Sequence, residues 1–280
     1  MTPTNTTQTG KKPRDSSVLR PKALIGMVHV GALPGTPHAS EPVADIVRRA
    51  VQEAQLLERS GFDAIIIENM HDRPYVHGRQ QPQIVAAMTR VAVEVISAID
   101  IPLGIQVLSG GEHEAIAIAH TVGAAFIRCE NFVYAHVADE GLLAEAVAGP
   151  LLRYRRAIGA TGVRVMCDIR KKHASHAVAG DLTIEDCAHT AEFCGADGVI
   201  VTGNFTGDPT DPSDVERVGR AVGVPVWVGS GVEPSQLGTL FASADALIVG
   251  SWIKHGGVWS NAPDAERCAE IVAEAERVRG

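Results

Sequence analysis

The chain alternates between short apolar runs rich in β-branched residues and longer segments in which apolar residues recur every three or four positions. The short runs have the length of strands, and the longer segments have the spacing of amphipathic helices. The pattern predicts strands at 23–30, 64–68, 103–108, 125–130, 163–168, 198–201, 226–229 and 246–249. It predicts helices at 43–60, 84–98, 112–121, 142–158, 184–194, 213–221, 234–241 and 263–278.

The eight predicted strands are apolar almost throughout, as is typical of strands in a parallel sheet covered on both faces. Three predicted helices end at a glycine shortly before the next strand, at Gly61, Gly123 and Gly195. We expect these glycines to cap the helices in the left-handed conformation. Eight βα units in succession favour an α/β fold, a closed (β/α)8 TIM barrel of the phosphate-binding type, over an open doubly wound sheet.

We expect one barrel domain over residues 21–280 and a disordered tail over 1–20, which is polar and lacks the apolar segment of a secretory signal. The 280 residues are 45% hydrophobic and 21% charged, which is typical of a globular protein. The formal charge of -8 argues against a nucleic-acid partner, since binding to the phosphate backbone needs a basic surface. No apolar run has the length of a membrane span, so we expect no integral membrane contact.

Five cysteines are scattered without a CxxC pair, which predicts free thiols and a cytoplasmic location. The sequence leaves the oligomeric state open, and a homo-oligomer is possible.

Glycine and serine follow the last two predicted strands, as Gly229-Ser230-Gly231 and as Gly250-Ser251. Glycine lets backbone N–H groups approach an anion closely, and serine adds a hydroxyl donor. In eight-stranded barrels, the loops after the last two strands commonly bind phosphate. We therefore predict a phosphate site there, with Gly203 and Asn204 after the sixth strand closing on it, although small residues after strands also serve as simple turns.

Charged residues interrupt the apolar pattern where predicted strands end. In a barrel, these ends share one rim, so we expect the side chains to converge there. The candidate catalytic residues are His29, Glu68, Arg128, Glu130, Asp168 and Lys171. Neighbouring carboxylates raise one another's pKa and prepare one of them for acid or base chemistry.

Structural interpretations of the same residues remain open. Glu68 would pair with Arg128 or with a neighbouring lysine as a buried ion pair, and His29 would be a hydrogen-bonded core histidine. Lys171 would lie in a solvated basic loop. Lys254 would either complement a phosphate or be a surface charge.

The acidic residues, together with His29, His71 or His173, offer ligands for magnesium, manganese or zinc. No compact metal-binding motif accompanies them, so a divalent metal remains a possible cofactor and no other cofactor is indicated. Two long segments that follow strand ends, 70–83 and 171–183, are candidate lids over the site.

The sequence resembles the BtpA family, also called BtpA/SgcQ. The resemblance rests on Ile25-Gly26-Met27-Val28-His29-Val30-Gly31-Ala32-Leu33-Pro34-Gly35, on Glu68-Asn69-Met70-His71-Asp72, and on Arg128-Cys129-Glu130-Asn131. It implies a barrel protein. The family name comes from a role in photosystem I biogenesis, and many relatives occur in non-photosynthetic bacteria beside sugar-transport genes.

The leading hypothesis is an enzyme that acts on a small phosphorylated metabolite, a sugar or nucleoside-derived phosphate, by isomerase, epimerase or lyase chemistry. Glu68, Asp168 or His29 would move the proton, and Arg128 would stabilise an oxyanion. One alternative is a non-catalytic assembly or stability factor of the photosystem I biogenesis type. Another is a metal-dependent hydrolase.

Overall fold

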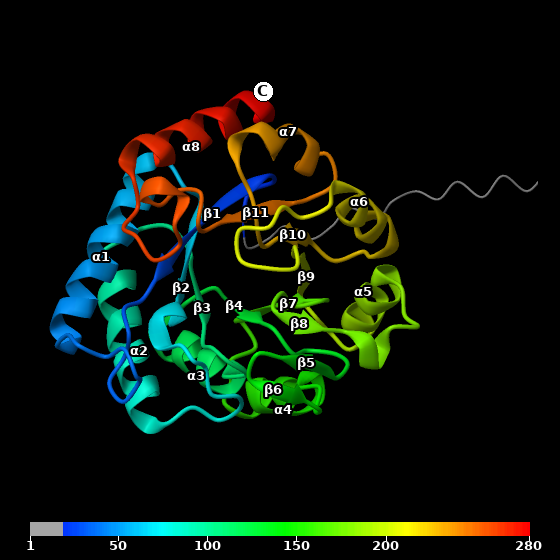
Figure 1. The fold of residues 1–280 in the computed structure, drawn as a ribbon, viewed down its shortest axis with the longest axis horizontal. Coiled ribbons are helices and arrows are strands. Elements are labelled where there is room, and N and C mark those ends of the chain that lie inside the picture. The colour runs from blue at the N-terminus through cyan, green and yellow to red at the C-terminus, as the bar shows by residue number, and fades with distance from the viewer. Residues whose placement is uncertain (1–18) are drawn as a thin grey trace, which may run out of the picture.

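The computed structural model describes residues 19–280, and the predicted tail falls almost entirely outside them. Within the described residues, eight parallel strands close into a barrel (Figure 1) in the order β1-β11-β10-β9-β7-β4-β3-β2. The barrel strands are β1 (Ala23–His29), β2 (Ala64–Glu68), β3 (Leu103–Gln106), β4 (Phe126–Cys129), β7 (Arg164–Asp168), β9 (Gly198–Val201), β10 (Val226–Val228) and β11 (Ala246–Val249). The predicted TIM barrel is confirmed.

Helices surround the barrel and alternate with its strands. They are α1 (Val43–Ser60), α2 (Pro82–Ile96), α3 (Glu112–Val122), α4 (Ala148–Ala157), α5 (Ile184–Phe193), α6 (Pro212–Ala221), α7 (Leu237–Leu240) and α8 (Ala265–Arg279). Short 3-10 helices lie at η1 (Met70–Asp72), η2 (Ala177–Ala179), η3 (Pro234–Gln236) and η4 (His255–Gly257). None of the helices in the described part of the chain is long and apolar enough to cross a membrane.

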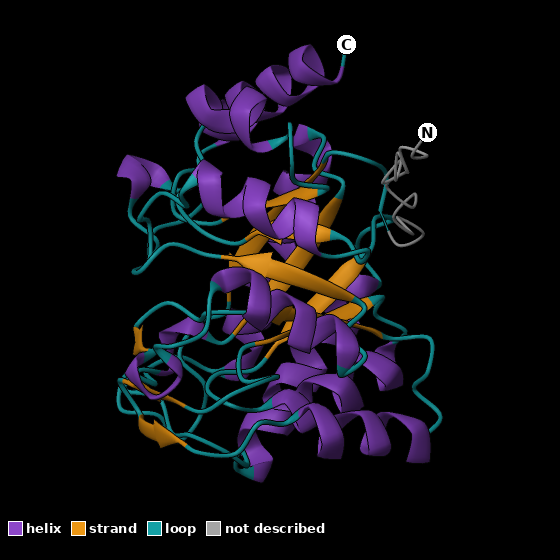
Figure 2. Cartoon of the chain, turned by 90° about the vertical axis from the view of Figure 1, so that its right-hand side faces the viewer, coloured by secondary structure: helices purple, strands orange, loops and turns teal. Residues whose placement is uncertain are grey.

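The prediction of a helix over 142–158 was wrong at its start, because a small antiparallel sheet occupies that segment. Its strands are β5 (His136–Ala138), β6 (Gly141–Leu143) and β8 (Ala174–Ser175), in the order β6-β5-β8. Figure 2 shows these short strands outside the barrel, among the loops on the left of the view. Strands of two or three residues are too short to show a period, and β8 joins the sheet only through the tertiary fold.

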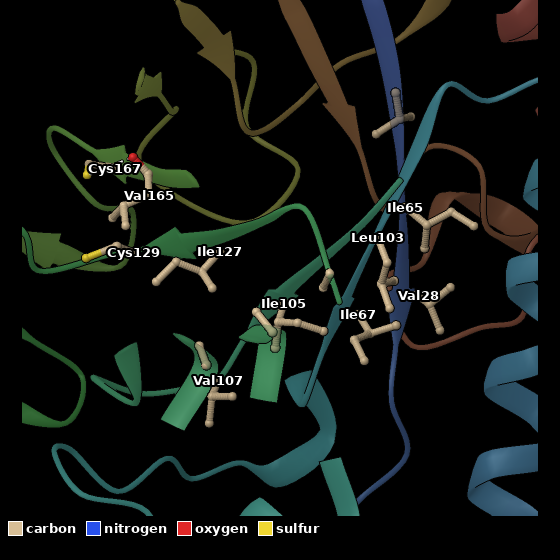
Figure 3. Packing of buried hydrophobic residues seen from close by; sticks show 14 of the residues in the cluster. Val28, Ile65, Ile67, Leu103, Ile105, Val107, Ile127, Cys129, Val165 and Cys167 are labelled. Atoms are coloured by element: carbon tan, nitrogen blue, oxygen red, sulfur yellow. Dashed lines mark hydrogen bonds between the residues drawn. The ribbon is translucent and has the colours of Figure 1, made fainter. Parts of the chain in front are cut away.

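Alternate residues of each barrel strand face the surrounding helices. Val28, Ile67 and Ile105 belong to this outward layer, and Figure 3 shows their side chains together with those of neighbouring strands. The outward layer is fully apolar, so burial against the helices stabilises the barrel by about 25 cal/mol for each Å² of apolar surface removed from water.

The remaining strand residues point into the barrel, where a second apolar cluster fills the interior. Phe126 and Trp227 meet edge to face there, with ring centroids 5.1 Å apart. Gly104 makes room for this packing, because a Cβ atom at that position would lie 2.2 Å from the Phe126 ring. The interior is therefore a packed core. It ends at the rim formed by the carboxyl ends of the strands, and we call this rim the mouth.

Several finer predictions are confirmed. Gly61 and Gly123 cap their helices in the left-handed conformation, and Gly195 has a φ of 90°. All five cysteines are free thiols. At the start of the described chain, Leu19 packs against the interior cluster and Arg20 pairs with Glu276 at 2.8 Å, so the barrel contacts begin just before residue 21.

Candidate active site at the barrel mouth

The alternation that packs the barrel interior also places the charged residues. Met27, Ile66 and Phe126 point inward, and the next inward positions along these strands are His29, Glu68 and Arg128. His29 and Glu68 are partners in register on β1 and β2, so their side chains emerge next to each other at the mouth. The sequence places these residues at strand ends, and the alternation explains why they face one another.

Arg128 and Asp168 form a buried ion pair across β4 and β7. The Arg128 Nη2 donates to Asp168 Oδ2 at 3.0 Å, and its Nε donates to Oδ1 at 3.2 Å. Burial raises the pKa of Asp168, and the guanidinium opposes that shift. Both side chains are almost completely shielded from solvent. Asp168 therefore holds Arg128 in place, which makes Asp168 a weaker candidate than Glu68 for moving a proton.

Lys171 lies between two carboxylates and is not part of a solvated loop. Its Nζ lies 3.3 Å from Glu130 Oε2 and 3.6 Å from Glu140 Oε2, and the residue is 6% exposed. Burial alone would raise the pKa of Glu130, but Lys171 and two nearby cations bring it below its ordinary value. Gln106 also donates to Glu130 Oε1 at 3.2 Å. Glu130 and Lys171 thus neutralise each other beneath the β5–β6 hairpin.

Glu68 differs from the other acidic residues at the mouth. Within the described residues, its carboxylate has no hydrogen bond and no ion pair, although only 5% of the residue is exposed. Burial raises the pKa of Glu68, and the charges of Lys172 and Arg128 oppose that shift. Glu68 does not form an ion pair with Arg128, because Arg128 pairs with Asp168.

Lys172 is a functional candidate that the sequence did not single out. It follows Lys171 directly, yet among the described residues its ammonium group makes no ion pair. Burial lowers the pKa of Lys172, and the nearby Arg128 charge adds to that effect. Sequence reasoning had no means of choosing between two adjacent lysines, since one is neutralised by Glu130 only in the folded chain.

His29 is a neutral imidazole held by the loop after β11. Its Nδ1 lies 2.8 Å from the Trp259 carbonyl oxygen, and this bond requires the proton on Nδ1. Burial and the charge of Lys254 lower the pKa of His29 well below its ordinary value. The unprotonated Nε2 faces Gly250, where a Cβ atom would lie 3.7 Å away. His29 therefore offers a proton acceptor to the mouth.

The glycine and serine residues after β10 and β11 present free backbone donors. The N–H groups of Gly231, Gly250 and Ser251 make no hydrogen bond to any residue in the range 19–280. Gly229 lies against Arg128, whose Nη2 would be 3.0 Å from a Cβ atom at that position. Unused N–H groups beside a buried cation are an arrangement suited to an anion.

The Ser230 hydroxyl is already used within the protein. Its oxygen accepts the Gly203 N–H at 2.6 Å, and its hydrogen is donated to the Asp208 carbonyl at 3.1 Å. Gly203 therefore has no free N–H for a ligand, and Asn204 is exposed away from the cavity. Thr206 and Gly207, farther along the same loop, line the cavity in their place.

Two connected cavities occupy the mouth. An inner cavity of about 30 Å³ is lined by His29, Glu68, Arg128, Lys172 and the glycine and serine ends of β10 and β11. An outer cavity of about 720 Å³ lies above it and is bounded by the 70–83 and 171–183 segments. Glu68, Met70, Lys172 and Thr206 line both cavities. The first residues of the two predicted lid segments, within 70–75 and 171–173, thus line the outer cavity.

Within the described residues, Lys254 and the suggested metal ligands do not form the sites that the sequence suggested. Lys254 is fully buried and donates to Glu53 Oε2 at 2.9 Å, so it neither contacts the anion site nor lies at the surface. In the described part of the chain, no group of three or more His, Cys, Asp or Glu side chains is arranged to hold a metal ion. The His71 ring packs on the Trp259 ring, and His173 Nε2 lies 2.8 Å from Thr206 Oγ1.

Comparison with known sequences agrees with the resemblance noted above. The family model described as the BtpA family matches residues 20–277. The chain belongs to the BtpA family. An uncharacterised mitochondrial protein of Caenorhabditis elegans is 39% identical over 91% of this chain and 94% of its own length. The photosystem I biogenesis protein BtpA of Synechocystis is 36% identical over 89% of this chain and 86% of its own length.

Two of the solved structures with the same fold are enzymes whose names include phosphorylated compounds. The geranylgeranylglyceryl phosphate synthase of Thermoplasma acidophilum, solved with sn-glycerol-1-phosphate, has a TM-score of 0.57 at 17% identity and covers 92% of this chain and 94% of its own. The thiamine phosphate pyrophosphorylase of Pyrococcus furiosus has a TM-score of 0.56 at 11% identity and covers 92% of this chain and 97% of its own. At these identities the likeness shows the fold alone.

Proposed function

We propose that this BtpA-family protein is a cytoplasmic enzyme of sugar phosphate metabolism that catalyses proton transfer on a small phosphorylated metabolite. The observation that carries the proposal is the inner cavity. It places an unpaired carboxylate, Glu68, opposite the free N–H groups of Gly231, Gly250 and Ser251. An acid/base group beside an anion site is the minimum that an isomerase, epimerase or lyase of a sugar phosphate requires.

The phosphate would accept hydrogen bonds from these N–H groups, and Lys172 would add a positive charge. Glycine and serine line this end of the cavity, so a phosphate bound there would fix the orientation of the sugar. Binding energy from the phosphate then positions the reacting carbon, and this positioning is a large part of catalysis.

Glu68 would remove a proton from a carbon next to a carbonyl group. The electron pair of the broken C–H bond moves onto the carbonyl oxygen, where Lys172 and the Arg128 guanidinium stabilise the negative charge. When a hydroxyl proton also moves between the two enediol oxygens, return of the carbon proton to the neighbouring carbon gives an isomer. Return of the proton to the opposite face of the same carbon gives an epimer. The raised pKa of Glu68 suits this role, because a general base works best when its pKa approaches the working pH.

Isothermal titration against a panel of sugar phosphates tests the anion site. Gly250→Val adds methyl groups where a Cβ atom already meets Met27 and His29 at ordinary contact distance, so it fills the inner cavity. We expect loss of sugar phosphate binding in this variant. Gly162→Val is the matched control, since nothing lies within 4 Å of a Cβ atom at that position. Absence of binding to the wild-type protein, or undiminished binding in Gly250→Val, would overturn the assignment.

One observation favours a second candidate function, an assembly factor like the Synechocystis relative. Val137 and Leu142 of the β5–β6 hairpin and Val178 of η2 are exposed apolar side chains. A partner protein would bury them. Rescue of a deletion strain separates the candidates: the catalytic function requires Glu68 and tolerates Leu142→Glu, whereas the assembly function has the opposite requirements.

A further inference from the structure

We infer that the ligand carries a planar heteroaromatic group in addition to its phosphorylated sugar, and that this group occupies the outer cavity. The inference rests on the proposed function, since it identifies the part of the ligand that lies beyond the anion site. The size of the outer cavity is the first argument. At about 720 Å³ it falls in the range of sites that enclose a whole drug-sized ligand, far more than a sugar phosphate fills.

The outer cavity has an apolar and aromatic part beside the charged residues that line it. Met70, Leu108, Tyr75 and Trp259 provide flat or smooth surfaces on different sides of it. The Tyr75 hydroxyl is bonded to the Met70 carbonyl at 2.8 Å, so the tyrosine presents its ring to the cavity and not a free donor. These surfaces favour a planar group that packs against aromatic rings.

Trp259 is held in a fixed position before any ligand binds. Its carbonyl accepts the His29 Nδ1 hydrogen, and its ring packs on the His71 ring at a centroid distance of 4.9 Å. The Arg73 guanidinium lies 5.0 Å from the centre of the indole. A preorganised aromatic wall lowers the entropy lost on binding, which is a property of recognition sites.

The charged side chains of the outer cavity indicate which hydrogen-bonding groups the planar ring carries. Glu130 and Glu140 both lie within ion-pair distance of Lys171, whereas Arg73 has no ion pair to any described residue. A guanidinium donates to ring nitrogens and carbonyl oxygens in the plane of a heteroaromatic ring. The planar group therefore carries hydrogen-bond acceptors on its edge.

The connection between the cavities places the reacting atoms. Glu68 and Lys172 line both, so a ligand with phosphate in the inner cavity and a ring in the outer one has its sugar carbons beside them. The carbons that bear the ring are then within reach of the proposed base.

Titration calorimetry with ribose 5-phosphate and with inosine 5′-monophosphate tests the inference. The two probes share the phosphorylated sugar and differ in the ring. We expect inosine 5′-monophosphate to bind at least about ten-fold more tightly, because its ring would be buried and would accept hydrogen bonds from Arg73. Arg73→Gln should remove most of this preference and leave the affinity for ribose 5-phosphate unchanged. Arg79→Gln, an exposed arginine of the same segment that does not line the cavity, is the matched control.

The outcomes distinguish this inference from the proposed function. Equal affinities for the two probes would overturn the inference and leave the phosphate site intact. A preference for inosine 5′-monophosphate that survives Arg73→Gln would also overturn it, since the ring would then lie elsewhere. Binding of neither probe would overturn the proposed function itself.

Discussion

The two sides of the barrel mouth use polar residues in opposite ways. On the β4 and β7 side, two sets of buried charges are paired: Arg128 with Asp168, and Lys171 with Glu130 and Glu140. We call this the paired side. On the side of β10, β11, β1 and β2, several polar groups that line the inner cavity have no partner among the described residues, and we call it the open side.

The paired side serves the stability of the fold, whereas the open side keeps groups available for a ligand. A buried charge without a partner is costly, so the ion pairs of the paired side are needed simply to keep those residues folded. The open side retains Glu68, His29 Nε2 and three backbone N–H groups that protein contacts leave unused. Groups that remain unsatisfied in a folded protein indicate where a ligand is expected.

The largest difference should appear when one carboxylate on each side is neutralised. Glu68→Gln keeps the shape of the open side but removes its base, and we expect exchange of solvent deuterium into the bound sugar phosphate to slow by about 10²- to 10⁴-fold. Nuclear magnetic resonance in D₂O measures this exchange. Glu130→Gln is the paired-side control and should slow exchange much less. Equal rates in wild type and Glu68→Gln would remove Glu68 as the base.

For the free energy of unfolding, substitutions on the paired side should have the larger effect. Arg128→Met leaves Asp168 buried without its partner, so we expect the free energy of unfolding to fall by about 3–5 kcal/mol. Urea unfolding measures the change. Adding Asp168→Leu to Arg128→Met should restore much of the loss, because Asp168 is then no longer an unpaired buried charge. A loss below about 1 kcal/mol in Arg128→Met would mean that the paired side does not stabilise the fold.

A change of pH should have a smaller effect on the free energy of unfolding. Burial lowers the pKa of His136, on the hairpin of the paired side, to about 4. Between the ordinary histidine value of 6.5 and about 4, the unfolded chain binds a proton that the native chain does not, so stability should fall as the pH falls through this window. His136→Gln should reduce the slope of stability against pH in urea unfolding. The exposed His120→Gln serves as the control, and an unchanged slope in His136→Gln would contradict the assignment.

Much of the fold was predictable because local pattern and fold agree in a βα barrel. The strands at 64–68, 198–201 and 246–249 were predicted at their observed bounds. The helix expected at 142–158 failed because β6 is defined by pairing with β5, not by a local period. The mouth residues were predictable as a group, since strand ends meet on one rim, but their partners were not.

The sequence by itself determined that eight βα units close into a barrel and that His29, Glu68, Arg128 and Asp168 share its mouth, because hydrophobic periodicity and strand ends are local properties. Only the tertiary structure decided which of these charges are neutralised. Asp168 pairs with an arginine 40 positions away, and Glu68 does not. Ion pairing depends on distances of a few ångströms between side chains from different strands, and a linear sequence does not record them.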